Sequence, residues 1–149
     1  TSKLTEWLQS DDLSGVIVCP SNPFVSIDPI LSVPGLREAL RQCTAPVIAV
    51  SPLVGGQAIR GPTVKMMQEM AIPTTAAWVA GHYRDFLQGF ILDTLDAASA
   101  ADVEALGITG HVTQTVMATL DDRVQLAAAC LEFIAQLSQS QRATTKLKE

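Results

Sequence analysis

Four short runs of apolar, mostly β-branched residues recur along the chain, each bounded by turn-forming residues. They are GVIVC (15–19), APVIAV (45–50), GFILD (89–93) and GHVTQT (110–115). Short runs of this kind are typical of buried parallel strands. We therefore predict four strands of one sheet.

Residues with helical spacing fill the intervals between these strands. Residues 35–43 carry Leu36, Ala39 and Leu40 at that spacing, and Pro62 fits the first turn of a helix that starts after Gly61. Further helices are expected at 76–86, 98–106 and 121–137, followed by a solvated tail at 138–149. The alternation predicts a single α/β domain over residues 1–149, a three-layer Rossmann-like fold with a mostly parallel sheet, helices on both faces and right-handed crossovers.

Composition narrows the class of protein. With 149 residues, 48% of them hydrophobic and 17% charged, the chain can form one compact core. A net charge of -5 argues against nucleic-acid binding, which needs clustered Lys and Arg. No apolar run reaches the ~18 residues that span a bilayer, and TSKLTEWLQS is not a signal peptide, so we expect a cytoplasmic protein without a membrane partner.

Two further expectations concern the cysteines and the chain start. Cys19, Cys43 and Cys130 form no CxxC pair and lie in apolar surroundings, which predicts reduced, buried thiols and argues against disulfides and zinc. Because the chain starts at Thr1 and a strand follows almost at once, we expect residues of a longer protein to precede it.

Ligands of such sheets bind at the carboxyl ends of the strands, and the first loop there is CPSNPFVSIDP. Ser21, Asn22 and Ser26 supply hydroxyl and amide donors, and three prolines stiffen the loop. A stiff polar loop at a helix entrance suits an oxyanion. The alternative is a capped turn, with Ser26 or Asp28 as N-cap and Pro29 at the first helical position.

The second loop, SPLVGGQAIRGP, favours a phosphate-like ligand. Gly55 and Gly56 let backbone approach a ligand, Ser51 offers a hydroxyl, and Arg60 can clamp a phosphate. Neither the Walker spacing nor GxGxxG is present, so the ligand class stays open. In the alternative interpretation the glycine pair only makes a turn and Arg60 is a solvated surface residue.

The remaining candidates are weaker. Asp93 and Asp96 are spaced so that both could reach one metal ion or simply cap the following helix, and we favour capping. His82 and His111 have no partner at metal-ligand spacing, and His82 is expected to be a helix-surface residue.

Together these stretches resemble a known family. PSNPFVSIDPILSVPGLREAL, APVIAVSPLVGGQAIRGP, WVAGHYRDFLQGFILDTLDA and TQTVMATLDDRVQLA, between about Gly15 and Leu137, are similar to the second half of the 2-phospho-L-lactate transferase (CofD-like) family. The resemblance implies transfer of a phospholactyl or phosphoenolpyruvyl group from a GDP-linked donor to the deazaflavin Fo, with Mg2+ assisting. GMP leaves, and the product is a precursor of coenzyme F-420.

The resemblance also implies which residues bind the donor phosphates. They are Ser21, Asn22, Pro23 and Ser26 in the first loop and Ser51, Pro52, Gly55, Gly56 and Arg60 in the second. The chain departs from the family at Gln57, where members often carry Lys. Since the chain resembles only the C-terminal half, it is expected to be a poor catalyst alone. A non-catalytic phosphate- or nucleotide-binding relative, and a homodimer formed through the last helix, remain alternatives.

Overall fold

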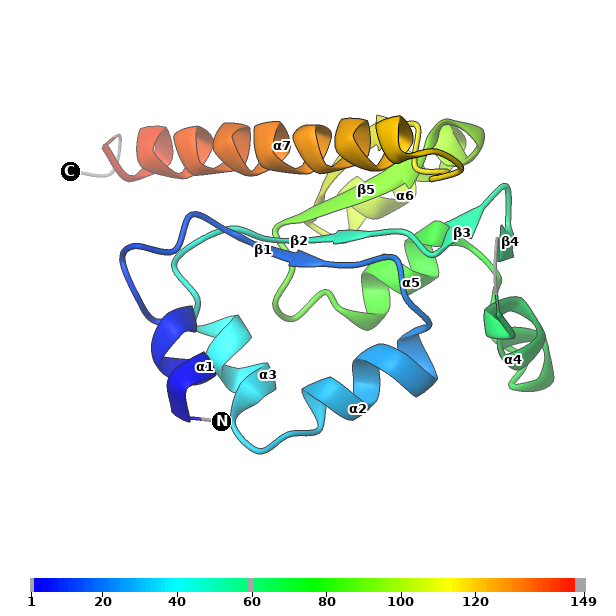
Figure 1. Ribbon diagram of the computed structural model, residues 1–149, viewed down its shortest axis with the longest axis horizontal. Helices are drawn as coiled ribbons and strands as arrows, with labels where there is room; N and C mark the ends of the chain where they lie inside the picture. The colour runs from blue at the N-terminus through cyan, green and yellow to red at the C-terminus, as the bar shows by residue number, and fades with distance from the viewer. Residues whose placement is uncertain (1, 59–60, 147–149) are drawn as a thin grey trace.

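The computed structural model of the chain describes residues 2–58 and 61–146 (Figure 1). Its centre is a four-stranded sheet of strand order β1-β2-β5-β6, in which every neighbouring pair is parallel. The strands are β1 (Val16–Val18), β2 (Val47–Val50), β5 (Gly89–Asp93) and β6 (Thr109–Thr113). All four predicted strands are thus confirmed, each within two residues of its expected bounds.

Helices cover both faces of this sheet, so the predicted three-layer α/β, Rossmann-like class is confirmed (Figure 1). On one face lie α1 (Ser2–Leu8), η1 (Pro23–Ile27), α2 (Asp28–Leu31), α3 (Leu36–Arg41), α5 (Ala76–His82) and α6 (Ala100–Ala105). Only α7 (Leu120–Lys146) packs on the other face, among the described helices. Two short elements, α4 (Thr63–Glu69) and η2 (Thr94–Ser99), follow the ends of strands.

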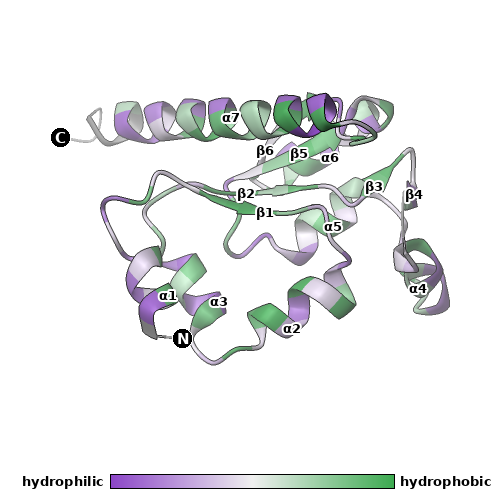
Figure 2. Cartoon of the chain, in the orientation of Figure 1, coloured by the Kyte–Doolittle hydropathy of each residue, from purple (hydrophilic) through white to green (hydrophobic). Residues whose placement is uncertain are grey.

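Strand side chains alternate between two hydrophobic clusters. Val47 and Ala49 of β2 point to the cluster under the short helices, whereas Ile48 and Val50 pack against α7. Every residue of β2 and β5 is buried. A strand covered on both faces needs apolar residues at every position, which explains the continuous apolar runs in the sequence. Figure 2 shows the same strands as hydrophobic segments between the two helix layers.

Two expectations about helix and thiol positions were wrong in part. Helix α7 does not end at residue 137 but continues to Lys146, because Gln, Ser and Arg are compatible with helix and Ser138 and Ser140 bond back to carbonyls four residues earlier. Residues 139–143 are exposed, so this part of the tail is solvated but helical. All three cysteines are free; Cys130 is buried as expected, but Cys19 is exposed at the end of the edge strand β1.

Several elements were not predicted. The first residues form α1, and Leu53–Val54 (β3) and Gln57–Ala58 (β4) form a small antiparallel hairpin. Within the described part of the chain, no helix is both long and apolar enough to cross a membrane.

The contact between α7 and the sheet predicts a steric test at Gly89. A Cβ at Gly89 would lie 2.5 Å from Cε1 of Phe133 and 2.9 Å from Cδ1 of Leu137. We expect Gly89→Ala to lower the free energy of unfolding by about 1–3 kcal/mol, measured by urea denaturation. Gly110→Ala is the matched control, since its nearest atoms would lie at 3.6 Å; equal losses in the two variants would contradict this packing.

Candidate functional site

The carboxyl ends of the four parallel strands meet at one edge of the sheet, and a loop leaves each of them. These loops begin at Cys19, Ser51, Thr94 and Gln114. Apart from Arg60, the residues expected to bind phosphate, and the pair Asp93 and Asp96, lie in the first three loops or at the end of β5, whereas His82 lies in α5 and His111 in β6. Arg60 lies outside the described residues.

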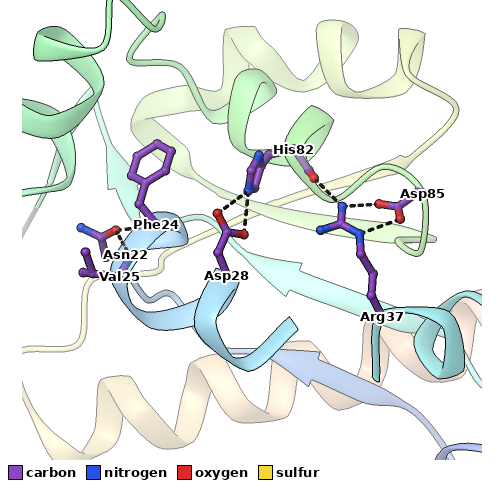
Figure 3. Close-up of polar contacts among 7 residues, drawn as sticks. All are labelled: Asn22, Phe24, Val25, Asp28, Arg37, His82 and Asp85. Atoms are coloured by element: carbon purple, nitrogen blue, oxygen red, sulfur yellow. Dashed lines mark hydrogen bonds and ion pairs between the residues drawn. The ribbon is translucent and has the colours of Figure 1, made fainter. Parts of the chain in front are cut away.

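Asn22 organises the first loop. Its Oδ1 accepts hydrogen bonds from the N–H groups of Phe24 (2.9 Å) and Val25 (3.2 Å), which caps the single π-helical turn η1, with Pro23 buried at its first position (Figure 3). Its Nδ2 donates to Sδ of Met66 in α4 at 3.5 Å. The alternative interpretation, a capped turn, placed the N-cap at Ser26 or Asp28; the capping side chain is instead Asn22, four and six residues earlier.

Two hydroxyls of the first loop are available to a ligand. Ser21 and Ser26 are half-buried, and neither side chain has a hydrogen-bond partner among the described residues. The backbone is fixed, since Ser21 N–H donates to the Cys19 carbonyl at 2.7 Å and Ser26 N–H to that of Asn22 at 3.1 Å. The loop thus presents two hydroxyls from a rigid frame.

The second loop is a hairpin turn. Gly55 (φ +58°) and Gly56 (φ +70°) form the two-residue connection between β3 and β4, and two consecutive positive φ angles strongly favour glycine. Ser51 is buried, and its Oγ donates to the Leu53 carbonyl (3.0 Å) and accepts from the Leu53 N–H (3.1 Å). The Ser51 hydroxyl therefore shapes the turn and does not face open space.

Asp96 occupies the glycine turn, a contact that the sequence analysis missed. The Gly55 N–H donates to its Oδ2 at 2.8 Å and the Gly56 N–H to its Oδ1 at 3.2 Å. The two N–H groups expected to approach a phosphate already hold a carboxylate of this chain. The turn is thus shown to bind an oxyanion, although that oxyanion is internal.

Asp93 joins the third and fourth loops. Its side chain is only 1% exposed and accepts from Leu95 N–H (3.0 Å), Thr115 N–H (2.8 Å), Thr115 Oγ1 (2.9 Å) and Thr94 Oγ1 (3.3 Å). Burial raises the pKa of Asp93, but these hydrogen bonds outweigh it and the net pKa is lowered. The favoured interpretation of Asp93 as a helix cap is confirmed at η2.

The structure does not bring Asp93 and Asp96 to a common ligand, since each carboxylate has its own hydrogen-bond donors. Among residues 2–58 and 61–146, no group of three or more His, Cys, Asp or Glu side chains is placed to hold a metal ion.

His82 is a structural partner of the first loop. Its Nε2 lies 2.8 Å and 3.1 Å from the two carboxylate oxygens of Asp28 (Figure 3). Its ring stacks on Trp78. Beside it, Arg37 binds Asp85 with two hydrogen bonds of 2.7 Å and 2.8 Å. The sequence favoured a helix-surface residue for His82, and it does lie at the end of α5; what the sequence missed is that it ties α2 to α5 and so fixes the loop that leads into α2.

We compared the chain with known protein families. Residues 1–105 match the family described as 2-phospho-L-lactate transferase CofD. The chain belongs to the CofD family.

Curated CofD-family relatives are considerably longer than this chain. A phosphoenolpyruvate transferase of Streptomyces griseus subsp. griseus is 38% identical over 123 residues, which are 82% of this chain and 39% of the relative. A 2-phospho-L-lactate transferase of Methanosarcina acetivorans is 37% identical over 135 residues, 91% of this chain and 41% of the relative. The chain spans about two fifths of the length of these relatives and matches their C-terminal portion, which confirms the resemblance seen in the sequence.

The Asp93 network predicts a pH-dependent loss of stability. We expect Asp93→Asn to lower the free energy of unfolding at pH 7 by about 1–3 kcal/mol, because the amide NH2 would face donors and leave one unpaired. Since folding lowers the pKa of Asp93, its stabilisation is complete above the unfolded value of about 3.9 and is lost as pH falls through the folded pKa.

The difference between wild type and Asp93→Asn should therefore shrink at acidic pH in urea titrations. Asp11→Asn, an exposed site in a turn, is the control and should show little difference at either pH. A constant gap across the pH range would contradict the assignment of a charged, hydrogen-bonded Asp93.

Proposed function

We propose that the chain supplies the donor-phosphate site of an enzyme that transfers a phospholactyl or phosphoenolpyruvyl group from a GDP-linked donor to the deazaflavin Fo, releasing GMP. The product would be a precursor of coenzyme F-420. The observation that carries the proposal is membership of the CofD family, together with relatives named phosphoenolpyruvate transferase and 2-phospho-L-lactate transferase. Because those relatives are more than twice as long, the activity is proposed for the chain acting with the remaining length of such a protein.

The first loop is proposed to bind the donor through its hydroxyls. Ser21 and Ser26 have half-buried side chains without described partners, at the sheet edge where ligands of parallel sheets bind. Asn22 and Pro23 hold the loop in shape, and the contact of Asn22 with Met66 sets its position against α4. A rigid loop binds phosphate with less loss of conformational entropy than a mobile one.

The glycine turn is proposed to bind a phosphate oxygen after Asp96 withdraws. Phosphate and carboxylate would compete for the N–H groups of Gly55 and Gly56, because both are oxyanions that accept such bonds. Ser51 and Pro52 support the turn, and Arg60 remains a proposed phosphate ligand.

The proposed transfer reaction depends mainly on positioning of the reactants and on stabilisation of charge. A ribityl hydroxyl of Fo would attack the phosphorus that bears the three-carbon group, the anhydride P–O bond would break with GMP as the leaving group, and the hydroxyl proton would pass to water. Mg2+ would neutralise charge on the phosphates when bound. Among residues 2–58 and 61–146, no group of three or more His, Cys, Asp or Glu side chains is placed to hold the ion.

A second candidate function is phosphate or nucleotide binding without catalysis. The internal carboxylate at the glycine turn and Gln57 in place of a lysine favour it. The two candidates differ in one measurement: only the transferase releases GMP when donor and Fo are supplied to a protein of full family length that carries this chain.

Calorimetric titration of the chain with GDP, with and without Mg2+, tests the donor site. We expect Ser26→Ala to weaken GDP binding by about tenfold, since a hydrogen bond to a charged group contributes about 1.5–3 kcal/mol. The matched control is Ser14→Ala, an exposed serine at the opposite, amino end of β1, which should leave the affinity unchanged. Absence of GDP binding both by the chain and by the full-length protein would refute the site.

The Asp96→Asn variant tests whether the Asp96 carboxylate competes with phosphate for the glycine N–H groups or instead helps to bind Mg2+. If Asp96 competes with phosphate, loss of its charge should tighten GDP binding severalfold, about 1 kcal/mol, in the absence of Mg2+. Asp102→Asn, which removes the same charge from the exposed surface of α6, serves as control. Weaker binding by Asp96→Asn without Mg2+ would contradict the competition.

A further inference from the structure

Two free thiols lie on the face of the sheet that α7 covers. Cys130 belongs to the hydrophobic cluster between α7 and the sheet, together with Ile48 and Val50 of β2, and is 3% exposed. Cys19 directly follows β1 and is exposed. Neither thiol is part of the proposed donor site, and the two differ in their access to solvent.

The side-chain alternation of β1 directs Cys19 towards α7. Val18 packs against the cluster on the other face, under the short helices. Successive side chains of a strand point to opposite faces, so the next residue, Cys19, points to the face that α7 covers. The register of β1 and β2 places Val18 beside Ala49. Extending this register by one residue sets Cys19 beside Val50, a member of the cluster that contains Cys130.

The electrostatics of Cys130 give a second line of support for this placement. Burial raises the pKa of the Cys130 thiol, and the nearby Cys19 thiol raises it further. Two thiolates repel each other appreciably only at short distance, so this effect requires Cys19 to lie near Cys130. The pair thus combines an exposed thiol, which an oxidant can reach, with a buried thiol beside it.

The end of β1 can approach α7 without disturbing the sheet. Cys19 lies one residue beyond the paired stretch Val16–Val18, and on the side away from β2 no strand among the described residues pairs with β1. Movement of Cys19 therefore leaves the paired residues of β1 and β2 in place. Since a disulfide needs Cα atoms about 4.4–6.8 Å apart, such a bond would close the end of β1 against α7.

We propose that Cys19 and Cys130 form a reversible, peroxide-driven disulfide that ties the end of β1 to α7. Hydrogen peroxide first transfers one oxygen atom to the Cys19 sulfur, which gives a sulfenic acid and one water. The Cys130 sulfur then attacks the Cys19 sulfur. The S–S bond forms, the S–O bond breaks, and the departing hydroxyl takes the Cys130 proton as a second water. A dithiol reductant restores both thiols and is itself oxidised to a disulfide.

The bond would act on the first loop. The Ser21 N–H donates to the Cys19 carbonyl at 2.7 Å, so a displacement of Cys19 is transmitted to Ser21. The side chain of the next residue, Asn22, caps η1. Oxidation would therefore restrain the part of the loop that carries the half-buried Ser21 hydroxyl. Formation of the disulfide does not require the proposed donor site to exist.

Treatment of the chain with hydrogen peroxide, followed by mass spectrometry, tests the bond. We expect the intact mass to fall by about 2 Da, because two thiol hydrogens are removed, and peptide mapping to find Cys19 linked to Cys130. Dithiothreitol should restore the starting mass. In the oxidised chain the Ser21 amide should exchange with solvent at least about threefold more slowly than in the reduced chain, because the linked loop opens less often.

Single cysteine variants locate the reaction. Cys19→Ser should abolish the linked peptides and leave Cys130 reduced, because the buried thiol is not the one that meets the oxidant. Cys43→Ser is the matched control, since Cys43 packs against the cluster on the other face of the sheet, and the linked peptides should remain. If Cys130→Ser fails to fold by circular dichroism, Cys130→Ala replaces it, because alanine keeps the cluster apolar.

Four results would overturn the proposal. They are unreacted thiols at Cys19 and Cys130 in excess peroxide, a sulfinic acid at Cys19 with Cys130 still reduced, a disulfide between the Cys19 residues of two chains, and linkage of Cys19 to Cys43. Linked peptides with unchanged exchange at Ser21 would overturn the effect on the first loop.

Discussion

A buried carboxylate that needs hydrogen-bond donors determines how the loops at the carboxyl ends of the strands are arranged. Asp93 ends β5 and is almost fully buried, and an ionised carboxylate in such a place is tolerated only with several donors. Leu95 and Thr115 supply them from two different loops. The same bonds begin η2 at a fixed position, and η2 carries Asp96 to the glycine turn after β2. One residue at a strand end thus connects three of the four loops.

The first loop is held by separate means. Asn22 caps η1 and touches Met66, and Asp28 binds His82 on α5, so the loop is fixed both to the helix after the second loop and to the helix layer below the sheet. The first loop, with its two available hydroxyls, and the glycine turn are therefore each held in place by their own hydrogen bonds. A ligand that bridged them would have to displace Asp96 from the glycine N–H groups, but it would not have to order either loop, which lowers the entropic cost of binding.

Sequence alone predicted the sheet well because helices cover both of its faces. Strands buried on both faces are continuous apolar runs, and such runs can be recognised from the local sequence without knowledge of distant contacts. It failed where a choice depended on contacts distant in sequence. Asn22, Ser26 and Asp28 all suit an N-cap by residue type, and only the fold shows that Asn22 is the one whose side chain caps. His82 and Asp28 are 54 residues apart, and Gly55 and Asp96 are 41 apart, so no local pattern reveals either pair. The extension of α7 was missed because its polar residues neither favour nor prevent helix strongly.

The open edge of β1 and the loop that carries Ser21 and Asn22 belong to the same strand, so the geometry of the sheet connects them. Parallel strands end at the same side of a sheet, so a strand added beside β1 would end next to Ser21 and Asn22 and would place its own loop against theirs. Ligands of open α/β sheets bind between such neighbouring loops rather than on one of them. A chain in which β1 lacks a neighbour can therefore present hydroxyls and N–H groups for phosphate while lacking the opposite wall of the cleft. On this argument a strand placed beside β1 would bring its loop to Ser21, where the proposed phosphate site has one open side.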